Sequence, residues 1–285
     1  MKAGRGNAEN EFIGVDVGGH DGKRIVYQQP KMLGFSCMTT NHKNLLRLYV
    51  SRETISGEEN AELSKGQIHY LRNVMRLEKG GTLRAFNGRN GEWLAEVTEI
   101  SKKKAIVTFL EKIREQSTSS DIEILASPVK KEAFDFMVEK ATELGAARFR
   151  PVICEHTVIH RANEERLKAL SIEASEQCER LDLMEITPLE SLLNALTNAW
   201  PSGRKLIFCI ERAEAPPILR ALEAHTKAPL SILIGPEGGF SDAEVRAISA
   251  MPFVIPVSLG PRILKAETAL IASLACIQAL RDRSP

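Results

Sequence analysis

The sequence lacks the marks of several classes of protein. No apolar run among its 285 residues approaches the roughly 18–20 residues that a membrane-spanning helix needs. The N-terminus also lacks the basic and then apolar pattern of a secretory signal. The five cysteines are scattered and never stand in Cys-x-x-Cys spacing, which argues against a disulfide framework or a zinc ribbon. We therefore expect a cytoplasmic protein with reduced thiols and no membrane partner.

Motifs of common catalytic classes are missing too. There is no Gly-x-Gly-x-x-Gly fingerprint, no Gly-Lys-Ser/Thr phosphate loop and no Gly-x-Ser-x-Gly nucleophile elbow. Cys154, His156 and His160 have the spacing of metal ligands, but they span a strand end and a loop without a fourth ligand nearby. We therefore expect no metal. The formal net charge of +1 does not mark the whole chain as a nucleic-acid binder.

Composition divides the chain into an extension and two domains. Residues 1–45 contain only short apolar pieces among Gly, Asn and charged residues, and we predict that they are disordered. Met38 would be a sensible alternative start. From 46 to 113 the pattern is β-rich and predicts a small β-barrel domain with one helical segment at 63–77. The small polar residues 114–120 predict a linker.

Positive charge gathers in the β-rich domain. Between positions 41 and 115 there are 14 Lys or Arg residues and 10 Asp or Glu residues. Arg72 and Arg76 lie four residues apart, on one helical face close to Tyr70, which suits contact with an RNA backbone and stacking on a base. An ordinary solvated face explains these residues equally well. The run Lys102–Lys104 predicts a strand edge protected by charge.

Beyond residue 120, strands and helices alternate. Five strand–helix units between 121 and 285 predict an α/β domain with a mainly parallel sheet, in which ligands bind beyond the carboxyl ends of the strands. This places "IGPEGGF" (234–240) and "SLGPRIL" (258–264) at one rim. In the first loop Glu237 would repel a phosphate, which favours a neutral or positive ligand, although an ordinary turn remains an alternative. Ser241 and Glu244 then form a Ser-x-x-Glu capping box that starts a helix.

The second loop leads into a helix of small residues. Arg262, Lys265 and Glu267 crowd its start, and the rest is mostly Ala, Leu, Ile and Ser. We predict that this helix is buried on more than one side, against its own sheet and a partner subunit.

The two loops together resemble the signature of the RsmE family. "IGPEGGFSDAEV" followed by "LGPRILKAETA" is similar to its paired C-terminal motifs. Three further segments resemble family motifs in the same order: "HYLRNVMRLEKG" (69–80), "KATELGAARFRPVICEHTV" (140–158) and "EASEQCER" (173–180). The resemblance covers about 46 to 281. It implies an S-adenosylmethionine-dependent methyltransferase that acts on N3 of a uridine in 16S ribosomal RNA, as RNA or within the 30S subunit.

The resemblance also implies a fold and a cofactor site. A PUA-like RNA-binding barrel (46–113) would precede an α/β SPOUT domain (121–285), which carries a C-terminal trefoil knot and forms a homodimer. The residues implied to hold S-adenosylmethionine are Cys209, Ile234, Gly235, Glu237, Gly238, Leu259, Gly260, Ile263 and Leu264. Apolar walls and glycines that permit close approach suit a neutral purine.

Catalytic roles follow from the chemistry that the resemblance implies. Arg262 is the first choice to stabilise the anion that forms as uridine N3 loses its proton, and Lys265 is the second. Glu267 or Glu237 would accept that proton or orient Arg262. We favour orientation, because a carboxylate in an ion pair is a weak base. The predicted contacts to RNA phosphates are Arg72, Arg76, Lys130 and Lys140.

Three positions depart from the family pattern. Lys265 stands where Arg is usual, Ala266 where Thr or Ser is usual, and His156 where Arg is expected. These departures bear on RNA contacts more than on the reaction class. A SPOUT methyltransferase for another RNA and a non-catalytic RNA-binding or ribosome-assembly factor stay open as alternatives.

Overall fold

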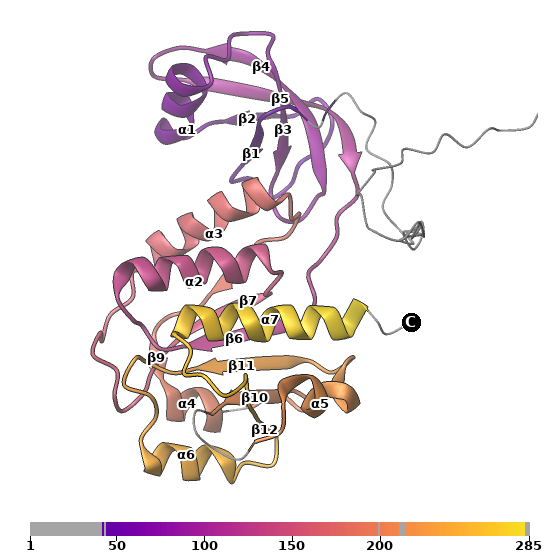
Figure 1. The fold of residues 1–285 in the computed structure, drawn as a ribbon. Helices are drawn as coiled ribbons and strands as arrows, with labels where there is room; N and C mark the ends of the chain where they lie inside the picture. The colour runs from indigo at the N-terminus through magenta and orange to yellow at the C-terminus, as the bar shows by residue number, and fades with distance from the viewer. Residues whose placement is uncertain (1–41, 43, 199, 211–214, 283–285) are drawn as a thin grey trace, which may run out of the picture. The chain divides into compact units, whose positions relative to one another are not determined.

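The structure is a computed structural model that describes residues 44–198, 200–210 and 215–282, together with His42 (Figure 1). The disorder predicted for residues 1–45 falls almost wholly outside the described residues. Two separate sheets organise the described chain. Within it, no helix combines the length and the apolar composition needed to cross a membrane.

The first sheet has five strands in the order β1-β3-β4-β5-β2. β1 pairs with β3 in parallel, and the other ladders are antiparallel. No ladder joins β1 to β2 in the part of the chain that the structure describes, so the predicted barrel is an open one. The strands are β1 (Arg47–Tyr49), β2 (Asn60–Glu62), β3 (Thr82–Phe86), β4 (Glu92–Ile100) and β5 (Ala105–Arg114).

The helical segment of this sheet is shorter than predicted and changes its pitch. Helix α1 (Lys65–His69) begins at a capping box, in which the Ser64 hydroxyl and the Gln67 amide each accept a backbone N–H of the other residue. It continues as a single π-helical turn, η1 (Tyr70–Val74), and the chain then turns at Arg76, which has a φ of 52°. This helical segment therefore ends before residue 77, although Leu71 is fully buried in the core of the sheet.

The second sheet is parallel throughout, which confirms the predicted α/β class. Its strand order is β12-β10-β11-β6-β7-β8, and β9 pairs with β7. The strands are β6 (Ile122–Ala126), β7 (Arg148–Ile153), β8 (Glu185–Ile186), β9 (Glu190–Ser191), β10 (Lys205–Cys209), β11 (Leu230–Ile234) and β12 (Val254–Val257). The helices are α2 (Lys131–Glu143), α3 (Glu164–Cys178), α4 (Leu192–Thr197), α5 (Ile218–Leu222) with a 3₁₀ turn η2 (Glu223–His225), α6 (Asp242–Ser249) and α7 (Ala266–Asp282).

Helices cover both faces of the second sheet. Successive side chains of a strand point to opposite faces, so Ile124 packs in one cluster with Met137 of α2 and Leu274 of α7. Leu125 packs in another cluster with Ile248 of α6. Figure 1 shows α2 and α7 on one side of the sheet and α4 and α6 on the other. This covering leaves the ends of the strands as the place where loops gather.

A buried ion cluster lies at the end of the first sheet. Glu92 has no exposed surface and accepts a hydrogen bond from the Arg47 guanidinium. Its second oxygen lies 3.5 Å from a nitrogen of Arg114 and 3.7 Å from a nitrogen of Arg84. Burial lowers the pKa of Arg47, and the neighbouring Glu92 opposes that shift. The Glu92 carboxylate therefore lies within ion-pair distance of three arginines, and Glu179 supplies a second carboxylate to Arg84 and Arg114.

The same arginines hold the C-terminal end of α3. Arg47 donates to the carbonyl oxygens of Ser175 and Arg180, and Arg84 donates to the Glu179 carboxylate at 2.8 Å. The hydrogen bond from Arg84 is the largest cause that lowers the pKa of Glu179. Glu179 has a φ of 62°, a left-handed conformation that usually favours glycine. Its ion pairs with Arg84 and Arg114 hold the side chain of this residue in place.

Candidate active site

The glycine loop between β11 and α6 lies at the carboxyl edge of the parallel sheet. The predicted capping box is present: the Ser241 hydroxyl accepts from the Glu244 N–H at 3.1 Å, and the Glu244 carboxylate accepts from the Ser241 N–H at 3.0 Å. Gly235 lies against the Phe240 ring, so that a Cβ added there would be 2.7 Å from a ring carbon. Gly239 has a φ of 68° and open space where a side chain would stand. The loop is therefore tightly folded at its start and open near its tip.

Loops from two neighbouring strands hold the glycine loop in place. The Glu237 carboxylate accepts from the backbone N–H of Lys130, at the start of α2, at 3.3 Å. His156, in the loop after β7, places its Nδ1 3.1 Å from the Gly238 carbonyl oxygen. A Cβ on Gly238 would be 3.2 Å from the Cβ of His156, so only glycine fits this contact without displacement. Three strand ends therefore fix the position of the glycine loop.

Two buried hydroxyls support this arrangement, and the sequence did not reveal them. Ser127 and Thr157 share a hydrogen bond of 2.7 Å between the ends of β6 and β7. The Thr157 hydroxyl also accepts from the Cys154 N–H at 2.8 Å, and the Ser127 N–H donates to the Ile234 carbonyl oxygen at 3.0 Å. The signal available was a polar residue soon after each buried strand, Ser127 directly after β6 and Thr157 four residues beyond the end of β7. Sequence alone does not show that such residues meet.

The second loop also leaves the carboxyl edge, after β12. Ser258 forms a parallel bridge with Pro217. Gly260 then takes a φ of 109° with open space around its missing side chain. Arg262 and Lys265 are exposed, and Ile263 is 59% exposed although it is a large apolar residue. The loop thus presents two cations and one apolar side chain to its surroundings.

Arg262 is a free cation in the described part of the chain. No ion pair joins Arg262 to Glu237 or Glu267 among these residues, and orientation of Arg262 by a carboxylate stays a prediction. The Glu237 carboxylate instead accepts a hydrogen bond from the backbone N–H of Lys130. Glu267 lies half-buried in the first turn of α7.

The remaining candidates for the cofactor pocket lie in these loops or at the ends of β10 and β11. Ile234 is buried at the end of β11, and Leu259 packs against the cluster that contains it. Leu264 is half-buried. Cys209 ends β10, and its Sγ lies 3.4 Å from the Ser273 hydroxyl of α7. Burial raises the pKa of the Cys209 thiol to about 11, which keeps it protonated and neutral near pH 7.

The four candidate RNA contacts differ in their surroundings: one forms ion pairs within the protein, and the other three are exposed. Lys140 lies 2.7 Å from carboxylate oxygens of both Glu139 and Glu143, and these hydrogen bonds raise its pKa. Lys130 is exposed at the start of α2. Arg72 and Arg76 are exposed in the first sheet's helical segment. The described residues contain no group of three metal-ligating side chains.

Comparison with known proteins places this arrangement in a family. The family described as "RNA methyltransferase domain" matches residues 115–278, and "RNA methyltransferase PUA domain" matches residues 63–110. The chain is 35% identical to ribosomal RNA small subunit methyltransferase E of Synechocystis, covering 83% of this chain and 78% of that protein. It is 30% identical to the protein of that name from Rickettsia conorii, covering 82% and 95%.

A solved structure supports the same assignment. Ribosomal RNA small subunit methyltransferase E from Neisseria gonorrhoeae, bound to S-adenosyl methionine, superposes with a TM-score of 0.72. The two chains are 28% identical, and the match covers 83% of this chain and 98% of that one. With a family match over more than half its length and relatives that it covers over more than three quarters of their length, the chain belongs to the RNA methyltransferase family of ribosomal RNA small subunit methyltransferase E.

Proposed function

We propose that the protein transfers a methyl group from S-adenosylmethionine to N3 of a uridine in 16S ribosomal RNA. The observation that carries the proposal is the glycine loop, braced by three strand ends, at the same sheet edge as a loop with an unpaired arginine. The relatives of this family are named for the small-subunit RNA on which they act.

The residues at the sheet edge fit such a cofactor. Gly239 and Gly260 both have positive φ and open space where a Cβ would stand, so a ligand can approach the backbone closely. Ile234 and Leu259 supply apolar walls. We assign binding to these residues together with Cys209, Gly235, Glu237, Gly238, Ile263 and Leu264. When bound, S-adenosylmethionine supplies the methyl group as a sulfonium electrophile.

The chain's own task is to prepare the uridine. N3 of a neutral uridine carries a proton and faces the Watson–Crick edge, so the base must be unpaired when it enters the site. Loss of that proton leaves negative charge on O2 and O4, which an adjacent guanidinium stabilises. We assign this role to Arg262, with Lys265 as the second cation. We assign acceptance of the proton to Glu267 rather than Glu237, because the Glu237 carboxylate already accepts a hydrogen bond from the backbone N–H of Lys130.

The quaternary structure and topology form part of the same proposal. The face of α7 that contains Ala275 and Ala279 is exposed, and such small side chains permit close approach of a second copy. We propose that this face contributes to a homodimer, that the segment 258–265 belongs to a trefoil knot, and that the enzyme works in the cytoplasm, where ribosomal RNA is found. We also propose domain limits at 46–113 and 121–285, and contacts to RNA phosphates at Arg72, Arg76, Lys130 and Lys140.

The function is tested by restoring the modification. Purified protein and S-adenosylmethionine are incubated with 16S ribosomal RNA, and separately with 30S subunits, from cells that lack the modification. RNA mass spectrometry is expected to detect 3-methyluridine at one position. Methylation of a different base or RNA would contradict the assigned substrate. Binding of RNA without binding of S-adenosylmethionine would indicate a non-catalytic factor.

Gly239→Ala is expected to weaken cofactor binding. The left-handed backbone at Gly239 costs an alanine about 1–2 kcal/mol, and its methyl group would enter the open space of the loop. We expect the Kd of S-adenosylmethionine, measured by calorimetry, to rise about tenfold. Gly203→Ala is the matched control, because Gly203 has a φ of 79° and open space but precedes β10, at the opposite edge. Equal effects of both substitutions would contradict a role of the loop in binding.

A further inference from the structure

Two tight turns meet at the carboxyl edge of the parallel sheet. The turn after β7 spans residues 154–157 and is closed by a backbone hydrogen bond of 3.1 Å between its first and last residues. The turn in the glycine loop spans residues 236–239 and is closed in the same way at 2.9 Å. His156 and Gly238 are the third residues of their turns, and the Nδ1 of His156 lies 3.1 Å from the Gly238 carbonyl oxygen. A side chain of one turn therefore contacts the backbone of the other.

The turn that carries His156 is fixed on both sides of this residue. On one side, the Glu155 N–H donates to the Glu244 carboxylate at 2.8 Å, and that carboxylate also closes the capping box of α6. On the other side, the buried Thr157 hydroxyl lies 2.7 Å from the Ser127 hydroxyl at the end of β6. The imidazole is therefore held against the glycine loop by backbone that is tied to two other elements.

The backbone that receives this contact is weakly determined by its own sequence. The peptide between Gly238 and Gly239 is flanked by two residues without a Cβ, so rotation of this peptide meets little steric resistance. Within the described ranges, its carbonyl oxygen accepts no hydrogen bond other than the one from His156. Because a carbonyl oxygen can only accept, that bond requires the proton on Nδ1. The Nδ1–H of His156 therefore selects one orientation of a peptide that could otherwise take several.

We propose that His156 is a positioning residue for S-adenosylmethionine, an inference that rests on the proposed function. A glycine loop that is ordered before its ligand arrives loses less conformational freedom on binding, and the affinity rises accordingly. His156 supplies this order through the Gly238 carbonyl oxygen, on the opposite side of the turn from the support that Lys130 gives to Glu237. The imidazole takes no part in the methyl transfer itself. Its removal should therefore change cofactor affinity and leave kcat at saturating cofactor close to that of the wild type.

The test compares two substitutions of His156 with one control. His156→Leu keeps an apolar side chain but removes the donor, whereas His156→Asn keeps an N–H donor at the same number of bonds from the backbone as Nδ1. His160→Leu is the control, because His160 is exposed in the same loop and makes no hydrogen bond or ion pair with any described residue. By calorimetry we expect the Kd of S-adenosylmethionine to rise about three- to tenfold in His156→Leu. His156→Asn and His160→Leu are expected to stay within about twofold of the wild type.

Amide hydrogen exchange in the protein without cofactor gives a second measurement that does not depend on activity. The Gly239 N–H closes the turn of the glycine loop, so it should exchange faster in His156→Leu than in His156→Asn or the wild type. Equal Kd values and equal exchange rates in the two His156 variants would overturn the inference, even if the wild type methylates uridine. A raised Kd and faster exchange in His156→Leu alone, with a wild type that binds S-adenosylmethionine but methylates no uridine, would support the inference and overturn the proposed function.

Discussion

Replacing Arg262 by alanine is expected to lower kcat by about 100-fold or more while changing the Kd of S-adenosylmethionine by less than about twofold. The guanidinium is exposed and makes no ion pair among the described residues, so its removal leaves no buried charge and little structural strain. Its expected contact is with the uridine anion, which exists only as the reaction proceeds. The loss therefore belongs to kcat rather than to cofactor binding.

Two variants make the result for Arg262 specific. Arg262→Lys keeps the charge but loses the planar pair of donors, and it is expected to recover only part of the rate. Arg246→Ala removes an exposed arginine from α6, near the site in sequence but outside the second loop, and should leave the rate unchanged. A large loss of cofactor affinity in Arg262→Ala would instead assign the side chain to the cofactor pocket.

Glu92→Gln is expected to destabilise the folded protein by about 3–5 kcal/mol. Glu92 is fully buried and lies within ion-pair distance of Arg47, Arg84 and Arg114. Glutamine preserves the shape but leaves three guanidinium groups without this countercharge. The free energy of unfolding, measured from urea denaturation, should fall accordingly.

Glu99→Gln provides the comparison for Glu92. Glu99 pairs with Lys104 at 2.8 Å, but both side chains are nearly half exposed, so water already screens their attraction. We expect a change of about 0–1 kcal/mol. If Glu92→Gln lowers the free energy of unfolding as little as Glu99→Gln does, the charge of the buried Glu92 carboxylate does not stabilise the fold.

The large elements of the fold could be predicted because their signals are local. Helices α2, α3 and α7 have apolar residues at helical spacing, and the central strands are short apolar runs. Strands β8 and β9 have two residues each and helix α4 has six, too short for any periodicity to appear. The helical segment at 63–77 was predicted too long, because the π-helical turn at Tyr70–Val74 leaves no trace in a pattern of apolar residues.

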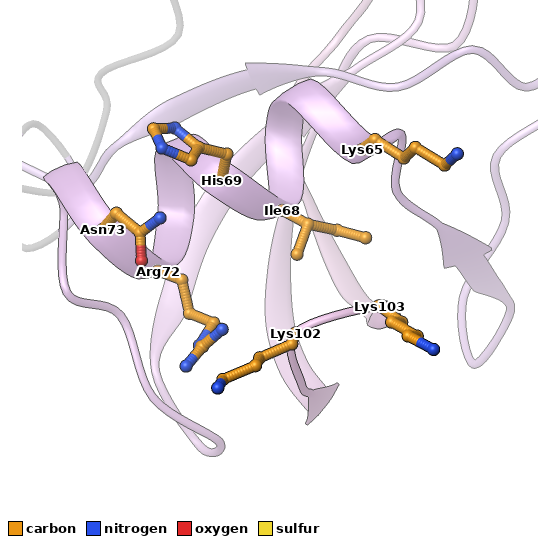
Figure 2. A pocket seen from close by; sticks show the side chains of 7 residues that line it. All are labelled: Lys65, Ile68, His69, Arg72, Asn73, Lys102 and Lys103. Carbon is orange, nitrogen blue, oxygen red and sulfur yellow. The ribbon is translucent and has the colours of Figure 1, made fainter.

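The candidate site was predictable in its loops but not in its supports. Two adjacent glycines and a Ser-x-x-Glu box are visible in the sequence, and they mark the turn and the helix start. The contact of His156 with Gly238 depends on which strands are neighbours, and no local pattern encodes that order. Likewise, the run Lys102–Lys104 predicted a strand edge protected by charge. In the structure Lys102 and Lys103 line one cleft with Arg72 (Figure 2), and no local pattern in the sequence indicates that these residues meet.

The strand order has a consequence for synthesis of the protein. Lys130 and Glu237 are 107 positions apart, and His156 and Gly238 are 82 apart, yet each pair meets in the finished site. Strand β6 leaves the ribosome long before β11, which is its neighbour on one side. Until β11 is made, that side of a fully buried, mostly apolar central strand has unpaired backbone groups, which invite aggregation. The nascent chain therefore needs protection at this edge, and it can bind its methyl donor only near the end of translation.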